Sequence, residues 1–185
     1  MNKFSTTVSL PYEPLTIDIR DMSDRVYRHS EVSLDKINPA MKAFLESKGV
    51  GVLMAEVFYT PPFLKRGIHI DTATGGDITK LNWIYCQGEH LMNWYEPKLD
   101  ANHTIAKTTV STHYVSYQDS EVNLIHTEKF ATSNVIVQVG IPHSVHNLRH
   151  PRWSLCFTIC HLSDKSRITV EQAQSIFKDY ICNLN

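Results

Sequence analysis

The chain has 185 residues, of which 42% are hydrophobic and 20% charged, and its formal net charge at pH 7 is −1. This length suits one domain with a sizeable core, and the composition is that of an ordinary globular protein. The near-neutral charge argues against a protein that coats nucleic acid, because such proteins carry a strong basic excess.

The first residues contain no apolar run, and no stretch of the chain approaches the roughly 20 apolar residues of a membrane span. None of the cysteines belongs to a C-x-x-C motif; they are Cys86, Cys156, Cys160 and Cys182. Cys156 and Cys160 would lie on one face of a strand, which is a poor geometry for a disulfide. We therefore expect a cytoplasmic protein with four free thiols and no membrane partner.

Two short alternating segments, at 8–10 and 15–19, open the chain, and the second predicts a strand. Asn38 followed by Pro39 has the pattern of an N-cap and a first helical residue, and Gly49 is a stop signal. These signals predict a helix over about 39–48.

The pattern then changes to short apolar or alternating runs separated by turn residues. The predicted strands cover 52–59, the His69–Asp71 segment, 80–86, 91–95, 108–117, 122–126, 135–139 and 153–160. Thr169 and Gln172 have capping-box spacing, and the apolar periodicity after them predicts a closing helix over about 170–183. We expect a mainly β sandwich or jelly roll, one domain over 1–185 with its core at about 52–160, and both helices packed outside one sheet.

His69 and Asp71 are the first candidates for chemistry. Residues i and i+2 of a strand point to the same face, so this imidazole and this carboxylate can aim at one point. Such a pair makes two thirds of the 2-His-1-carboxylate triad that holds Fe(II) on one side and leaves other positions open. The pair alone is equally compatible with a hydrogen bond between two strand residues and no metal.

A second imidazole and a cation follow later in the chain. His143 comes just after the strand at 135–139 and a Gly-containing turn, with His146 as its rival three residues on. Arg152 opens the last strand, and its planar fork suits a carboxylate, whereas its rival Arg149 lies in a loop. Alternation places Arg152, Ser154 and Cys156 on one face of that strand, and Trp153, Leu155 and Phe157 on the other.

The order His-x-Asp, distal His and then Arg resembles the Fe(II)/2-oxoglutarate-dependent oxygenases, in particular the aspartyl/asparaginyl β-hydroxylase-like and related phage or bacterial members. Further segments that resemble these family members are Leu-Asn-Trp-Ile at 81–84, Trp-Tyr at 94–95 and Pro-His-Ser-Val-His-Asn at 142–147. The resemblance covers about 52–160. It implies a double-stranded β-helix, the cupin-like jelly roll. In that fold His-x-Asp follows the second core strand, the distal His follows the seventh and the Arg follows the eighth.

The resemblance also implies roles and a reaction. His69, Asp71 and His143 would ligate iron, Arg152 would bind the outer carboxylate of 2-oxoglutarate, and Asn82 would contact this co-substrate. The implied activity is a dioxygenase that hydroxylates a small-molecule or peptidyl substrate with dioxygen and releases succinate and CO2. The alternative is a non-catalytic jelly-roll structural protein or a metal-binding cupin-like protein.

Several expectations depend on this framework. The strand of Arg152 should neighbour the one that delivers His143. The substrate would be selected by loops at 72–79, 87–104 and 118–134, and the chain would act as a monomer or homodimer. His113 with His126 is a weak candidate for a second metal site, and the histidines at 90, 103, 113, 126, 150 and 161 are otherwise expected at the surface or on edge strands.

Overall fold

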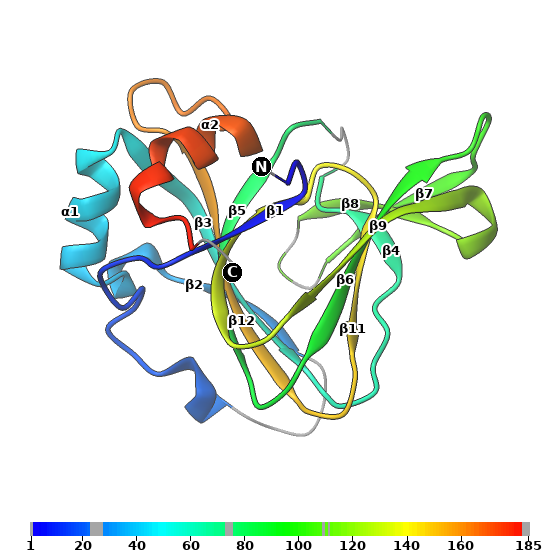
Figure 1. Cartoon of the computed structure of the whole chain (residues 1–185), viewed down its shortest axis with the longest axis horizontal. Coiled ribbons are helices and arrows are strands. Elements are labelled where there is room, and N and C mark those ends of the chain that lie inside the picture. Colours follow the sequence, from blue (N-terminus) through cyan, green and yellow to red (C-terminus); the bar gives the residue numbers. More distant parts are fainter. Residues whose placement is uncertain (1, 23–27, 73–75, 109, 111, 183–185) are drawn as a thin grey trace.

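Two antiparallel six-stranded sheets face each other in the computed structural model, which describes residues 2–22, 28–72, 76–108, 110 and 112–182 (Figure 1). The first sheet has the order β1 (Ser5–Val8), β10 (Ser133–Gln138), β5 (Thr79–Cys86), β12 (Arg152–His161), β3 (Val50–Thr60) and β2 (Arg28–Val32). The second has the order β7 (His103–Lys107), β8 (His113–Tyr117), β4 (Ile68–Ile70), β11 (His143–Asn147), β6 (His90–Pro97) and β9 (Val122–Phe130).

The strand order is that of a jelly roll. Along the chain β3, β4, β5 and β6 alternate between the two sheets, and β9, β10, β11 and β12 alternate back. On the return, β12 inserts between β3 and β5, and β11 inserts between β4 and β6. This double-stranded β-helix confirms the predicted fold class. The β7–β8 hairpin is an addition that pairs with β4.

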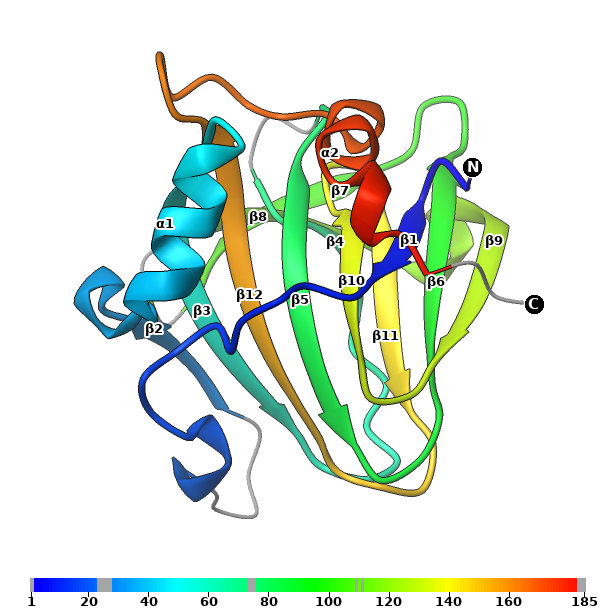
Figure 2. The ribbon, with the colours of Figure 1, turned by 60° about the vertical axis from the view of Figure 1, so that its left-hand side comes forward.

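Both α-helices cover the outer face of the first sheet, as predicted (Figure 2). They are α1 (Pro39–Ser47) and α2 (Val170–Ile176), accompanied by the 3-10 turns η1 (Ile19–Met22), η2 (Leu34–Lys36), η3 (Asp119–Glu121) and η4 (Lys178–Tyr180). The main hydrophobic core lies between the helices and this sheet, and includes Met41, Leu45, Leu81, Trp83, Leu155, Phe157 and Phe177. No helix of the described part is long and apolar enough to span a bilayer.

The predicted helix starts are confirmed. The Asn38 side chain accepts a hydrogen bond from the Ala40 backbone N–H, with Pro39 at the first helical position. Gly49, just after α1, has a φ of 74°, which is left-handed backbone that favours glycine. Thr169 and Gln172 form both hydrogen bonds of the capping box at α2.

Two of the predicted elements were wrong at the ends of the chain. Residues 15–19 form no strand, because Ile17 is 44% exposed and only Leu15 makes a β-bridge, to Ile37. The closing helix ends at Ile176, since Ile181 leaves it to pair with Val8 in β1; residue 183 lies outside the described part.

Other strands also differ from expectation. The first strand, β1, is Ser5–Val8 and shares only Val8 with the alternating segment at 8–10, and β9 continues to Phe130 beyond the expected end at 126. The strand expected over 108–117 is only β8, because the Thr108 and Thr112 backbones form a turn. Residues 109 and 111 of that turn lie outside the described part.

The space between the two sheets is divided. One half holds an apolar cluster that includes Phe4, Ile84, Met92, Trp94, Val135 and Val137. In the other half, β3 and β5 carry polar side chains, namely Glu56 of β3 and Lys80 and Asn82 of β5, and all three are buried. The jelly roll therefore has one closed apolar half and one half able to hold a polar site.

His90 is an exception to the expected surface histidines. It is 1% exposed, and no described residue forms a hydrogen bond to either ring nitrogen. Burial, reinforced by the positive charge of Arg152, lowers the pKa of His90 to about 2. A buried imidazole without partners is a cost to folding.

We predict that His90→Leu makes the protein less sensitive to acid. The unfolded chain takes up a proton at this position as the pH falls below about 6.5, whereas the folded chain resists it, so the wild type loses stability in that direction. Between pH 6.5 and 4.5 the wild type should lose about 2 kcal/mol more of its unfolding free energy than His90→Leu. Urea unfolding at both pH values measures this; equal losses in the two proteins would contradict it.

Candidate metal centre

His69 and His143 face each other across two neighbouring strands. His69 is the middle residue of β4, and His143, the first residue of β11, is its direct partner in the antiparallel pair. Directly opposite residues project from the same face of a sheet. The two imidazole rings accordingly lie with their centroids 4.5 Å apart.

Asp71 follows β4 and completes the group. Its Oδ1 lies 3.3 Å from Nε2 of His69 and 3.6 Å from Nε2 of His143. One donor atom from each of the three residues falls within 4.8 Å of the others, as expected for side chains that can share one ion. The structure thus brings together the three residues that the sequence nominated.

Backbone carbonyls orient both imidazoles. Nδ1 of His69 donates to the carbonyl oxygen of Gly67 at 2.8 Å, and Nδ1 of His143 donates to that of Ile141 at 2.9 Å. With Nδ1 engaged in this way, Nε2 is the nitrogen of each ring that faces Asp71 and is placed to act as a metal ligand. This is how metal-binding histidines are generally held.

The protonation states also suit a cation. Burial, helped by His69, lowers the pKa of His143 to about 4. Burial would raise the pKa of Asp71, but Lys80 and the two histidines hold it well below its ordinary value. A neutral His143 beside an ionised carboxylate is the state that binds a metal without first losing a proton. Two nitrogens and one carboxylate oxygen fit a divalent first-row metal.

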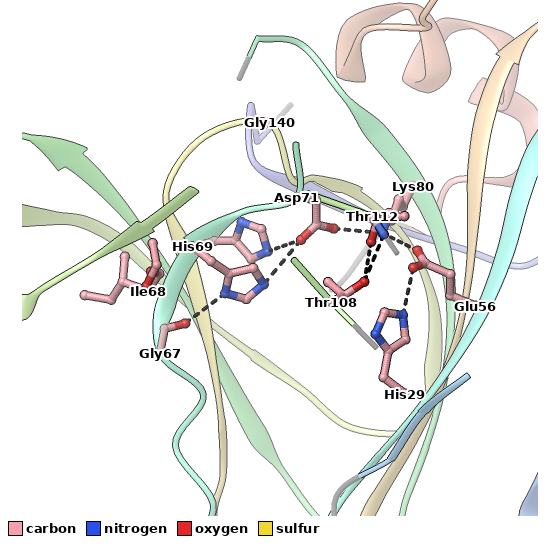
Figure 3. A network of polar contacts seen from close by, with 12 residues as sticks. His29, Glu56, Gly67, Ile68, His69, Asp71, Lys80, Thr108, Thr112 and Gly140 are labelled. Atoms are coloured by element: carbon pink, nitrogen blue, oxygen red, sulfur yellow. Dashed lines mark hydrogen bonds and ion pairs between the residues drawn. The ribbon is translucent and has the colours of Figure 1, made fainter. Parts of the chain in front are cut away.

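A close backbone contact positions the segment behind Asp71. The Asp71 N–H donates to the Val139 carbonyl, and the Val139 N–H donates to that of Ile78. A Cβ atom on Gly140 would lie 1.5 Å from the carbonyl oxygen of Gly76, so only glycine fits there (Figure 3 shows Gly140 above Asp71).

Two neighbouring cavities adjoin the candidate metal centre. The larger, about 590 Å³, is lined by His69 and Asp71 together with residues of β3 and the β7–β8 hairpin. The smaller, about 60 Å³, is lined by His69, Asp71, His143, Asn82 and Arg152 among others. Phe58, Arg66, His69, Asp71 and Lys80 line both cavities, so the donor group is accessible from each of them.

Arg152 enters the smaller cavity as a buried cation. It is 6% exposed, its Nη2 donates to Ser154 Oγ at 3.3 Å, and its Nε has no hydrogen-bond partner among the described residues. Burial lowers its pKa to about 10, and no carboxylate is among the charged groups that act on it. Asn82, on the same cavity wall, has a buried Oδ1 that likewise lacks a described partner.

One expectation about Arg152 was wrong. Its strand, β12, pairs with β3 and β5 in the first sheet, whereas β11 lies in the second sheet. The two strands are consecutive in the chain but cross from one sheet to the other, as a jelly roll requires. Arg152 therefore faces the metal-binding group from the opposite wall of the sandwich, and is not beside His143 on one sheet.

The rival residues lie elsewhere. His146 is an odd number of residues from His143 on the same strand, so it belongs to the opposite face of the sheet, where Ser144 Oγ is 3.4 Å from its Nε2. Arg149 is exposed in the turn before β12. His113 and His126 are not on neighbouring strands, since β8 and β9 are separated by three others in the sheet.

Sequence reasoning missed Lys80, Glu56 and His29, which line the larger cavity. The available signal was a charged residue inside each of two runs that otherwise indicated buried strands, 52–59 and 80–86. The loops expected to select the substrate contribute little to this cavity. Thr72 and Ile78 come from the expected 72–79 loop, of which 73–75 lie outside the described part, but its other described walls come from β2, β3, β5, β12, Arg66 and 107–114.

No family model and no curated protein matches the chain. Solved structures to which it is similar include E. coli ycfD, with 14% identity, a TM-score of 0.43 and coverage of 83% of this chain and 41% of that one. An oxalate oxidase in complex with the substrate analogue glycolate has 10% identity, a TM-score of 0.38 and coverage of 94% and 88%. Cellulomonas parahominis L-ribose isomerase with L-psicose has 10% identity, a TM-score of 0.38 and coverage of 83% and 73%.

The class of the chain follows from its own strand order and side chains. The chain has the jelly-roll fold, and its sandwich contains a candidate His-Asp-His metal centre.

We predict that His143→Ala abolishes tight metal binding. Loss of a hydrogen bond that only orients a metal ligand typically lowers metal affinity about 10–100-fold. Loss of one of the three ligands themselves should therefore weaken Co(II) or Zn(II) binding by more than about 100-fold. Competition with a chromophoric chelator measures the affinity. His146→Ala is the matched control and should bind as the wild type does; a stronger effect at His146 than at His143 would reverse the assignment.

We predict that Gly140→Ala perturbs the same site through the backbone. The added methyl group must displace the Gly76 segment, which should destabilise the fold by about 1–3 kcal/mol and weaken metal binding. Gly67→Ala is the control, since a Cβ atom there has nothing within 4 Å. Thermal unfolding and metal titration of both variants test this, and equal behaviour would contradict it.

Proposed function

We propose that this chain is an Fe(II)- and 2-oxoglutarate-dependent dioxygenase that hydroxylates a small-molecule or peptidyl substrate. The observation that carries the proposal is Arg152, a buried guanidinium with no acidic partner among the described residues, in a cavity that also exposes the donor group. Two nitrogens and one carboxylate oxygen on one side leave the remaining positions of Fe(II) for other ligands.

2-Oxoglutarate suits this arrangement because it carries a 2-keto acid at one end and a carboxylate at the other. The keto-acid end would bind Fe(II) held by His69, Asp71 and His143, and the far carboxylate would receive the charge-assisted hydrogen bonds of Arg152. Asn82, whose Oδ1 lacks a partner among the described residues, lies on the same wall and would contact the co-substrate. A cation buried at this depth is costly until such an anion binds.

The larger cavity would hold the substrate. Its volume of about 590 Å³ is within the range of small-ligand sites, and it reaches His69 and Asp71 directly. When bound, Fe(II) and 2-oxoglutarate would supply the oxygen chemistry, in which one oxygen atom of O2 enters succinate and the other the hydroxylated product, with loss of CO2. The chain's own residues hold the two reactants side by side and enclose them between the sheets.

The alternative is a jelly roll that binds metal without this chemistry, or has no catalytic role. Such a protein has no use for a buried guanidinium beside the donor group, which is why Arg152 favours the oxygenase. We also propose a cytoplasmic location, which the four free cysteines support.

We predict that Arg152→Ala weakens 2-oxoglutarate binding at least tenfold. It removes charge-assisted hydrogen bonds worth roughly 1.5–3 kcal/mol each, while Fe(II) affinity should change little because no donor atom is altered. The measurement is anaerobic titration of the Fe(II) protein with 2-oxoglutarate, followed by the metal-to-ligand charge-transfer band.

Arg149→Ala is the matched control and should titrate as the wild type does. Equal affinity in Arg152→Ala and the wild type would remove Arg152 from the site. A wild-type protein that binds Fe(II) but neither binds 2-oxoglutarate nor forms succinate would overturn the oxygenase proposal in favour of a metal-binding cupin-like protein.

A further inference from the structure

A buried chain of charged side chains connects the metal-binding carboxylate to the opposite sheet (Figure 3). The Lys80 side chain is 6% exposed, and its Nζ lies 2.8 Å from Oδ2 of Asp71 and 2.8 Å from Oε2 of Glu56. The other oxygen of Glu56, Oε1, lies 2.8 Å from Nε2 of His29. Asp71 follows β4 of the second sheet, whereas the other three residues belong to the first.

Stability alone is a weak explanation for this lysine. Burying an ammonium group between two carboxylates costs about as much in lost hydration as the ion pairs return, and apolar residues of similar size commonly serve as well. Lys80 must also extend across the sandwich to reach Asp71. The contact of Lys80 with Asp71 therefore explains the burial of this lysine better than stability does.

The two oxygens of Asp71 have separate partners. Oδ1 is the atom within 3.6 Å of Nε2 of both His69 and His143, and Oδ2 is the atom that accepts from Lys80. A carboxylate can bind a metal through one oxygen or through both. An oxygen engaged by an ammonium group at 2.8 Å is drawn away from the side where the imidazoles converge.

We propose that Lys80 is a positioning residue that keeps Asp71 a one-oxygen metal ligand, so that the position Oδ2 would otherwise take stays open to ligands. This inference rests on the metal site of the proposed function but not on 2-oxoglutarate. An open position next to Asp71 faces the larger cavity, because His69, Asp71 and Lys80 all line it.

Glu56 and His29 hold the lysine in place. Glu56 is 2% exposed and accepts from Lys80 through one oxygen, while His29 engages the other. The His29 ring stacks on Phe58, with centroids 4.3 Å apart and an interplanar angle of 14°. A lysine side chain has four rotatable bonds, so two carboxylate partners on opposite sides are what restrict its ammonium group to one place.

The test uses a variant that preserves the local charge. Lys80→Met alone leaves Glu56 buried without its cation and risks unfolding. Lys80→Met/Glu56→Gln removes one positive and one negative charge, so the net charge beside the metal is unchanged, and the new amide can still engage His29. Lys65→Met is the control, because Lys65 forms an ion pair of the same 2.8 Å length with Asp119 at the surface.

The readouts are the visible spectrum of the Co(II)-loaded protein and its affinity for azide, a small anion that takes open metal positions. In the double variant Oδ2 becomes free to bind, which raises the coordination number, weakens the Co(II) absorption by about half, and lowers azide affinity by about fivefold or more. Lys65→Met should match the wild type in both. Circular dichroism and thermal unfolding establish that the variants are folded.

Each outcome decides something. A folded double variant with the wild-type Co(II) spectrum and azide affinity overturns the role of Lys80 and leaves the oxygenase proposal intact. The expected spectral change in a protein that does not bind 2-oxoglutarate supports Lys80 and overturns the oxygenase proposal. A wild-type protein that binds no Co(II) overturns both. If the double variant does not fold, Lys80→Arg is measured in its place, because it keeps the positive charge. Its azide affinity must equal that of the wild type; a different affinity overturns the inference.

Discussion

The pairing of β4 with β11 is the interaction on which the candidate site depends. It sets His143 directly opposite His69, and a shift of one residue would turn one imidazole to the outer face of the sheet. Two backbone contacts near the pair reinforce this register. The Asp71 N–H donates to the Val139 carbonyl, and Gly140 packs closely against Gly76. Three donor atoms from two segments that are distant in the sequence thereby converge.

Stability and chemistry occupy different layers of the molecule. The main hydrophobic core lies between the two α-helices and the outer face of the first sheet, and includes Trp83 and Phe157. Because burial there, and in the apolar half of the sandwich, can supply much of the folding free energy, the other half can contain buried charges such as Lys80 and Arg152. The cost of those charges is the physical reason to look for their ligands.

Much of the fold could be predicted from local patterns. Helix starts at Asn38 and Thr169 depend on caps within a few residues, and strand faces such as Trp153 against Arg152 depend on alternation alone. Predictions failed where a distant partner decided the outcome. The alternation at 15–19 indicated a strand that has no neighbour to pair with beyond one bridge, and the last helix ends early because Ile181 pairs with Val8.

The sequence by itself determined the class of fold and the rejection of a long apolar span, because both depend on residue type and short-range spacing. It also nominated His69, Asp71, His143 and Arg152, although the choice of His143 and the role of Arg152 rested on the resemblance to a family. Only the tertiary structure decided that Arg152 faces the donor group from the opposite sheet and that Lys80 links Asp71 to Glu56. These are relations between residues of different strands and sheets. Strand order and register create them, and neither can be read from local periodicity.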